Sequence, residues 1–354
     1  MSRFLSYIHN LRGIAILFVV GVHARGNSLD WVSNQDTAKF MASIFDAQEG
    51  NGTVMFLFIA GFLFQHLTQH KFDFTKYLNQ KFKVIILPYL IISIPIIIFR
   101  IMTQYQPFSL SAEFVTQSFA YQFIYHLVIG THMSPFWFIT AIILFYVTSP
   151  VLHWLDKPAF FRYVFPFIFL VGMFTYRPDH NLNPVLAYFH YLPVYLTGMW
   201  ASRYKDRIFT MNIVPLYILS AVYVLITYFD LQGAFTLPAS LSFEKVIDER
   251  LVVFNIYILR TIILCFAMAL LFYRLQFVKM PVLETLAEYS FGIYFVHFIM
   301  IIATRKVLSL LYIPVDFSSI TFLIFLLFNL LCSTMVVFLI KKLTGPYSRN
   351  LIGS

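Results

Sequence analysis

Charged residues are scarce in this sequence. Of its 354 residues, 12% are Asp, Glu, Lys or Arg and 60% are hydrophobic, whereas soluble domains carry about 25% charged residues. A water-soluble fold of this length has too little interior to hide so much apolar surface. The composition therefore excludes a soluble protein and predicts an integral membrane protein, in which lipid surrounds the apolar side chains.

The motifs of several common enzyme classes are also missing. The two cysteines, Cys265 and Cys332, lie alone in apolar runs, so we expect buried thiols without a metal site. The histidines show no H-E-x-x-H spacing, and there is no phosphate-binding G-x-x-x-x-G-K-[ST] loop. We therefore predict no metal and no ATP hydrolysis. The net charge of +9 includes no clustered basic domain, which argues against nucleic acid as a partner.

Long apolar runs take the place of these features. A helix needs about 20 apolar residues to cross the hydrocarbon. We expect spans near 5–24, 52–68, 84–102, 135–153, 163–176, 185–201, 212–229, 251–272, 288–304 and 318–340. The stretch 113–130 is amphipathic and fits a re-entrant or interfacial helix or a loop. The predicted fold class is all-α, a single membrane domain over residues 1–354 with about ten transmembrane helices.

Ten spans place both ends of the chain on one side of the membrane. With the amino terminus inside, the inner segments hold fifteen Lys and Arg residues and the outer segments eight. Cytoplasmic loops carry an excess of these residues, so both termini are predicted to be cytoplasmic. The longest polar outer segments, 25–51 and 103–134, contain five acidic residues and can form a lid over an outward-facing site.

The first apolar run has a second interpretation as a cleaved signal peptide. Residues 14–22 form a short apolar core after Arg3 and Arg12, and the sequence V-H-A at 22–24 fits a signal-peptidase site. We favour a retained membrane span, because cleavage would remove both polar residues of this segment.

Those two polar residues are Arg12 and His23, and polar side chains inside a span are costly enough to be candidate functional residues. They are eleven residues apart, which places them within about 20° of the same helix face and about 16 Å apart along the axis. They cannot touch each other, but they can contact the two ends of one elongated ligand. Without a function, Arg12 would be an anchor that extends to the cytoplasmic interface, and His23 an outer-interface histidine.

Four segments, in order along the chain, resemble the acyltransferase-3 family of integral membrane acyltransferases. Residues 10–17 (N-L-R-G-I-A-I-L), with His23 following, match the family's L-R-G-[IL]-A opening and its arginine-to-histidine spacing. Residues 56–63 (F-L-F-I-A-G-F-L) resemble its F-F-x-[LI]-S-G-F-L segment, with alanine in place of serine. Residues 136–138 (F-W-F) resemble W-[FY]-[LI], and residues 290–297 (S-F-G-I-Y-F-V-H) resemble S-[YF]-[GS]-[IL]-Y-L-x-H.

One departure concerns the R-x-x-R pair that the family usually has before a proline. Here Lys83 and Ile86 occupy those positions ahead of Pro88. Lys81 is a compensating candidate, although a lysine is a point charge without the planar fork of arginine. The departure leaves open how the donor's phosphates are held and whether the donor is a lipid-borne acyl group.

The resemblance implies transfer of an acyl group, with acetyl expected, from cytoplasmic acyl-coenzyme A to a hydroxyl of an extracytoplasmic carbohydrate such as a cell-surface polysaccharide. His23 is the expected general base. Arg12, with Lys81 and Lys83, is expected to hold the phosphate end of acetyl-coenzyme A. The family also implies a bacterial inner membrane, and any partner that completes the transfer is expected to be a separate chain.

The donor of a hydrogen bond to the developing oxyanion is left open among Trp137, Ser290 and Tyr294. His297 shares a helix face with Ser290 and Tyr294. It is a candidate for orienting the substrate or for catalysis, with a packed polar stripe between helices as the alternative.

Two other classes of function compete with an enzyme. A glycan or small-molecule transporter or flippase fits the apolar bundle, but a proton-driven transporter needs a carboxylate deep in the membrane. By our assignment, all sixteen acidic residues lie in loops or near the ends of spans. A receptor or scaffold predicts that Arg12 and His23 can be replaced without loss.

Overall fold

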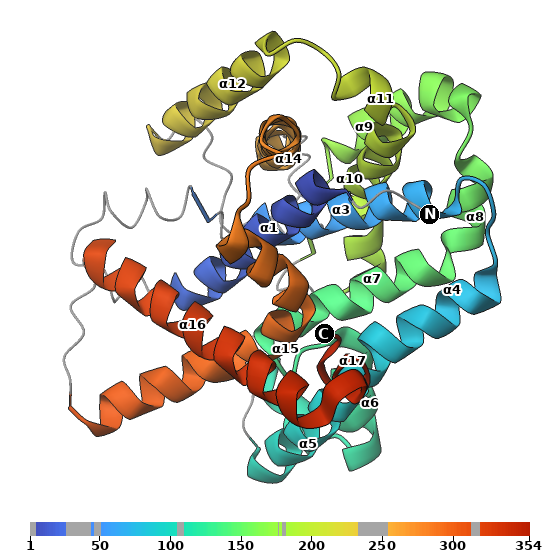
Figure 1. The fold of residues 1–354 in the computed structure, drawn as a ribbon. Coiled ribbons are helices and arrows are strands. Elements are labelled where there is room, and N and C mark those ends of the chain that lie inside the picture. The colour runs from blue at the N-terminus through green and yellow to red at the C-terminus, as the bar shows by residue number, and fades with distance from the viewer. Residues whose placement is uncertain are drawn as a thin grey trace.

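The computed structural model describes residues 5–25, 44–45, 51–104, 110–175, 177–178, 182–232, 254–312 and 319–354. Within them, all regular secondary structure is helical, as predicted (Figure 1). The elements in chain order are α1 (Ser6–Arg25), α3 (Asn51–Thr68), α4 (Phe74–Lys81), η2 (Phe82–Ile86), α5 (Leu87–Thr103), η3 (Ala112–Thr116), α6 (Phe119–Ile129), η4 (Ser134–Phe136), α7 (Trp137–Val147), α8 (Ser149–Leu155), η5 (Phe160–Val164), α9 (Phe165–Gly172), α10 (Pro184–Arg203), α11 (Lys205–Ile208), α12 (Val214–Leu231), α14 (Ile256–Arg274), α15 (Pro281–Leu310), α16 (Ser319–Thr344), η7 (Gly345–Tyr347) and α17 (Ser348–Ile352).

The predicted apolar runs all overlap helices in this structure. Among the described residues, seven helices are long and apolar enough to cross a membrane, and they include α1, α3, α12, α14, α15, the continuous helix Phe74–Thr103 and the helix Ile320–Ile352. The chain is therefore a multi-pass helical membrane protein. The predicted total of ten spans and the cytoplasmic position of both termini stay predictions.

An eighth candidate span is bent. Helix Phe119–Ile129 and helix Ser134–Val147 pass the length and composition test together, but their axes differ by 64°. Gly130 makes this turn with a φ of +84°, and a Cβ there would lie 2.7 Å from the backbone carbonyl carbon of Phe136. Both the positive φ and the lack of space for a Cβ require a glycine at this position. Such a bend is typical of a broken span or a re-entrant segment. It lies at the end of residues 113–130, the amphipathic stretch identified in the sequence.

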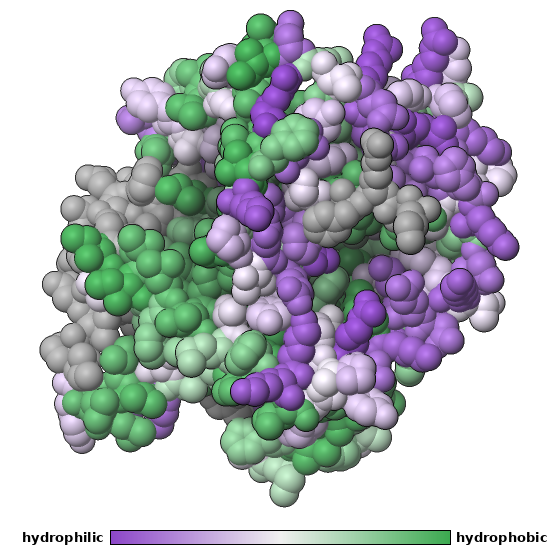
Figure 2. Space-filling view, viewed as in Figure 1, coloured by the Kyte–Doolittle hydropathy of each residue, from purple (hydrophilic) through white to green (hydrophobic). Residues whose placement is uncertain are grey.

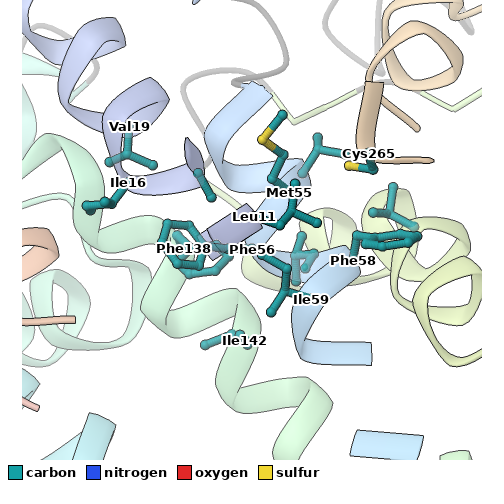
Figure 3. Packing of buried hydrophobic residues seen from close by; sticks show 14 of the residues in the cluster. Leu11, Ile16, Val19, Met55, Phe56, Phe58, Ile59, Phe138, Ile142 and Cys265 are labelled. Atoms are coloured by element: carbon teal, nitrogen blue, oxygen red, sulfur yellow. The ribbon is translucent and has the colours of Figure 1, made fainter. Parts of the chain in front are cut away.

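Helix α1 lies at the centre of the bundle. It packs against α3, α14, α15 and α16. Figure 3 shows its inward side chains interleaved with those of α3, α7 and α14. The labelled core residues are Leu11, Ile16, Val19, Met55, Phe56, Phe58, Ile59, Phe138, Ile142 and Cys265. Cleavage after Ala24 would therefore remove a helix that contacts four others.

Helices α3 and α10 cross with their backbones close together. A Cβ added at Gly61 would lie 2.0 Å from the carbonyl oxygen of Tyr195, and one added at Gly198 would lie 2.1 Å from that of Phe58. Small residues allow this approach, because in a membrane helices associate by packing and not by exclusion of water.

Polar side chains within the bundle are tied to one another. The Arg203 Nε donates to Asp156 at 2.8 Å, and the Gln65 amide donates to the same carboxylate at 3.2 Å. Ser202 in turn donates to Gln65 at 2.7 Å. These bonds join the end of α8 to α3 and α10, so this carboxylate lies at the end of a helix and has internal partners.

Helix α12 stands apart from the other helices and packs chiefly against α14 (Figure 1). None of its residues is buried. Near its end, Asp230 accepts from the buried Arg260 guanidinium at 2.7 Å and from the Tyr257 hydroxyl at 3.1 Å. An ion pair therefore anchors a helix whose residues are all exposed or half-buried.

The two kinds of surface are segregated. Figure 2 shows hydrophilic residues gathered over α4, α8 and α11, and hydrophobic residues over α16 and α5. Of the two cysteines, Cys265 is buried as expected, whereas Cys332 is only partly buried because it lies near the outside of the bundle on α16. The predicted lid at 25–51 lies almost wholly outside the described residues.

We expect Gly61→Ala to destabilise the protein by about 1–3 kcal/mol, because the added methyl group overpacks the α3–α10 crossing. Thermal unfolding in detergent would measure the change. Ala221→Val on the exposed surface of α12 adds apolar atoms where nothing packs, and serves as the matched control. Equal stability of Gly61→Ala and the wild type would contradict the close crossing.

Candidate active site

Two histidines meet where α1 and α15 lie side by side. The ring centroids of His23 and His297 are 5.1 Å apart with an interplanar angle of 71°, and Phe298 covers His23 at 5.5 Å. At the other end of the same helix pair, Gly13 faces Leu283, where a Cβ would lie 2.5 Å from the carbonyl oxygen. The two helices therefore run in the same direction, and His297 is brought to the residue that the sequence predicted as the base.

Backbone carbonyls set the tautomer of both neutral imidazoles. The Nδ1 of His23 lies 2.8 Å from the carbonyl oxygen of Val19. The Nδ1 of His297 lies 2.7 Å and 3.0 Å from those of Tyr294 and Ile293. Because a carbonyl oxygen only accepts, each Nδ1 carries the hydrogen and each Nε2 keeps its lone pair. The Nε2 of His297 is buried without a partner among the described residues. The pair thus offers a basic nitrogen to a hydroxyl.

Arg12 lies three turns earlier on α1, and its guanidinium is left largely unsatisfied. Its Nη2 lies 3.5 Å from the Nδ1 of His9, and its Nε is buried without a partner among the described residues. No described carboxylate forms an ion pair with it. Glu288, on the neighbouring helix, pairs instead with Lys341. Arg12 is half-buried, and Glu288 acts on it through its charge without an ion pair. The guanidinium therefore still has donors to offer an anionic ligand.

The two lysines proposed to assist Arg12 have different surroundings. The Nζ of Lys81 lies 5.2 Å from the ring centroids of both Tyr77 and Tyr146. Lys83 is exposed, and its side chain forms no hydrogen bond or ion pair with described residues. The π-helical turn η2 begins between them, at Phe82. Such wide turns change the direction of the side chains that follow and occur often at functional sites. Lys81 is therefore directed into the bundle and Lys83 is not.

The three candidates for a hydrogen-bond donor to the oxyanion differ in whether their hydrogen is already bonded. Ser290 donates to the carbonyl oxygen of Ala287 at 2.9 Å, and the Tyr294 hydroxyl donates to that of Pro135. Both hydroxyl hydrogens are thus already used. The indole N–H of Trp137 has no hydrogen-bond partner among the described residues, which leaves it as the one candidate donor with a free hydrogen.

Trp137 is connected to the histidines through two aromatic rings. It contacts Phe138 at 6.2 Å between ring centroids, Phe138 contacts Tyr294 at 5.8 Å, and Tyr294 contacts His297 at 6.0 Å. The bond from Tyr294 to Pro135 joins α15 to the turn that precedes α7. The bent segment and the histidine pair are therefore one packed unit.

Sequence reasoning missed the residues that only tertiary contacts reveal. His132 is buried on the bent segment, its Nδ1 lies 3.0 Å from the His126 carbonyl oxygen, and its Nε2 has no partner among the described residues. Arg177 lies against Trp137. In the sequence, Arg177 counted only toward topology, and His132 was one of the histidines without metal-ligand spacing. Among the described residues, no three His, Cys, Asp or Glu side chains are grouped to hold a metal ion.

The fold and these contacts define a multi-pass membrane protein with a buried histidine site and a separate cationic site along one helix. A family model described as an acyltransferase domain matches residues 5–340. The chain therefore belongs to the acyltransferase-3 family, whose members are acyltransferases, as the four sequence segments predicted. Searches of curated proteins and of solved structures found no match.

We expect Tyr294→Phe to lower stability more than catalysis. It leaves the buried Pro135 carbonyl without its donor, a loss that costs about 1–3 kcal/mol. The measurements are thermal unfolding in detergent and the rate of label transfer from acetyl-coenzyme A. Tyr289, on the same helix, makes no hydrogen bond through its hydroxyl among the described residues, so Tyr289→Phe is the control. Unchanged stability with a kcat lowered by about 10²–10³ would instead make Tyr294 an oxyanion donor.

Proposed function

We propose that this acyltransferase moves an acyl group, most simply acetyl, from cytoplasmic acyl-coenzyme A to a hydroxyl of an extracytoplasmic carbohydrate, and that it does so in a bacterial inner membrane. The observation that carries the proposal is that α1 bears two different sites, one near each end. Near one end of this helix the Arg12 guanidinium forms no ion pair with any described residue, and near the other end His23 lies beside His297 of α15, each with a basic nitrogen.

The chemistry of the two ends matches the two ends of the donor. Acyl-coenzyme A carries phosphates at one end and a thioester at the end of a long flexible arm. A guanidinium binds phosphate oxygens with two parallel hydrogen bonds. Eleven residues of helix separate Arg12 from His23, or about 16 Å, a distance that the arm can span. The donor can then reach an outward acceptor while its phosphates stay at the inner side.

In the transfer step, the Nε2 of His23 takes the proton of the acceptor hydroxyl as the oxygen attacks the thioester carbonyl carbon. Collapse of the tetrahedral intermediate breaks the carbon–sulfur bond, and the proton passes to the leaving sulfur. The products are an ester and free coenzyme A. His297 provides a second basic nitrogen beside the first and excludes water from it. The indole N–H of Trp137 is the proposed hydrogen-bond donor to the oxyanion.

We expect His23→Gln to lower the transfer rate by about 10²–10⁴, the usual contribution of a general base. The assay follows radiolabelled acetyl-coenzyme A with purified protein, for both hydrolysis and transfer. His70→Gln, at an exposed position on the hydrophilic end, is the matched control. Activity within a few-fold of wild type in His23→Gln would remove this residue from the mechanism. Absence of turnover in the wild type with acetyl and succinyl donors would favour a transporter or a lipid-borne donor.

We expect Arg12→Ala to raise the KM for acetyl-coenzyme A by about tenfold or more, as the loss of a charge-assisted hydrogen bond would, with a smaller effect on kcat. Lys81→Gln should have the same direction of effect, because its side chain points into the bundle. Lys83→Gln, two residues away and exposed, is the control and should leave KM unchanged. Equal KM values for Arg12→Ala and wild type would disprove the separate phosphate site.

A further inference from the structure

A cation that the transfer mechanism does not use lies beside Trp137. The guanidinium carbon of Arg177 is 5.8 Å from the centroid of the Trp137 ring, and Tyr191 stacks on the same indole at 5.8 Å and 24°. Arg177 is half-buried and forms no ion pair with any described residue. Within the described part of the chain, its charge is thus held against an aromatic ring and not in an ion pair.

The chain around Arg177 is held in place by its neighbours. The Asn255 backbone N–H donates to the Met173 carbonyl oxygen at 2.6 Å, and the Asn255 amide donates to that of Thr175 at 3.2 Å. Pro178, which follows Arg177, is buried. Residues 173 and 175 are thus held by α14's cap residue, and Pro178 is packed inside, which positions the chain near the arginine before any ligand arrives.

The position of Trp137 links this cation to the reaction. Trp137 is the first residue of α7, directly after the turn whose Pro135 carbonyl accepts from Tyr294, and Tyr294 packs on His297. A ligand that contacts both the indole and Arg177 therefore lies along one packed set of side chains that leads to the histidine pair.

We propose that Arg177 and Trp137 form an acceptor subsite for an anionic saccharide, one with a carboxylate or a phosphate near the hydroxyl that is acylated. This rests on the proposed function in taking the acceptor to be a saccharide. The guanidinium fork matches a carboxylate or phosphate with two parallel hydrogen bonds. The indole, stacked on Tyr191, holds the guanidinium beside the reaction site, while its N–H remains for the oxyanion. A neutral saccharide would supply no charge to pair with the guanidinium.

Binding to the purified full-length protein tests the subsite without requiring turnover. The probes are three trisaccharides at low ionic strength, one neutral (maltotriose), one of uronic acids and one carrying a phosphate, followed by calorimetry. At least one anionic probe should bind about tenfold or more tightly than the neutral one. Arg177→Gln should abolish this preference, and Arg177→Lys should keep part of it. The anionic probe that binds more tightly distinguishes carboxylate from phosphate recognition.

The matched control is Arg162→Gln. Arg162 lies 5.4 Å from the ring of its exposed neighbour Tyr163, which is the same pairing of arginine and aromatic ring in a surface position. This variant should keep the full preference for the anion. Equal affinity of the wild type for all three probes, absence of binding by any of them, or an undiminished preference in Arg177→Gln would overturn the subsite.

Acyl transfer to the same three probes separates this inference from the proposed function. Preference for the anion without any transfer from acetyl-coenzyme A would overturn the proposed function and support the subsite. Transfer to the neutral probe at the same KM as to both anionic probes would support the function and overturn the subsite.

Discussion

The approach of two helices to α1 is the constraint on which the rest of the structure depends. Gly13 lets α15 come so close that a Cβ would lie 2.5 Å from the Leu283 carbonyl oxygen, and Gly52 lets α3 approach the Ala15 carbonyl oxygen to 2.7 Å by the same measure. A side chain at either position would push the helices apart. The separation of α1 and α15 in turn decides whether His23 and His297 meet.

Polar groups in the bundle fall into two sets. Asp156 with Arg203, Asp230 with Arg260, and Asn329 with Thr304 are matched to internal partners, as groups shielded from water must be. The Nε of Arg12, the Nε2 of His297 and the Nε2 of His132 are buried atoms without partners among the described residues. A buried polar group without a hydrogen-bond partner lowers the stability of the fold, so each such group needs an explanation, and ligand binding is one. Other buried atoms without partners among the described residues, such as the Nε of Arg260, lie elsewhere. The three named here stand out because Arg12 and His297 lie along the α1–α15 pair with His23, and His132 lies on the bent segment packed against it.

Much of the fold follows from apolar run length. Each predicted apolar run overlaps a helix, and the amphipathic stretch before Gly130 is part of the bent segment. Both features could be predicted because helix formation depends mainly on residues that are close together in the sequence. The position of α12, which packs mainly on α14, was not predictable, since hydrophobicity alone does not say which apolar faces meet protein and which meet lipid. The separate surroundings of Lys81 and Lys83 were equally hidden, because a π-helical turn leaves no clear mark in composition.

For the site, the sequence by itself determined that Arg12 and His23 share one face of one helix, because helical geometry depends only on their spacing. The family could also be inferred from the sequence, because each of the four matching segments is a short run of consecutive residues. Only the tertiary structure decided that His297 lies beside His23 and that Arg177 lies against Trp137. It also decided that the hydroxyls of Tyr294 and Ser290 donate to carbonyl oxygens. These contacts join residues far apart in the chain, and their distances depend on how closely the helices pack.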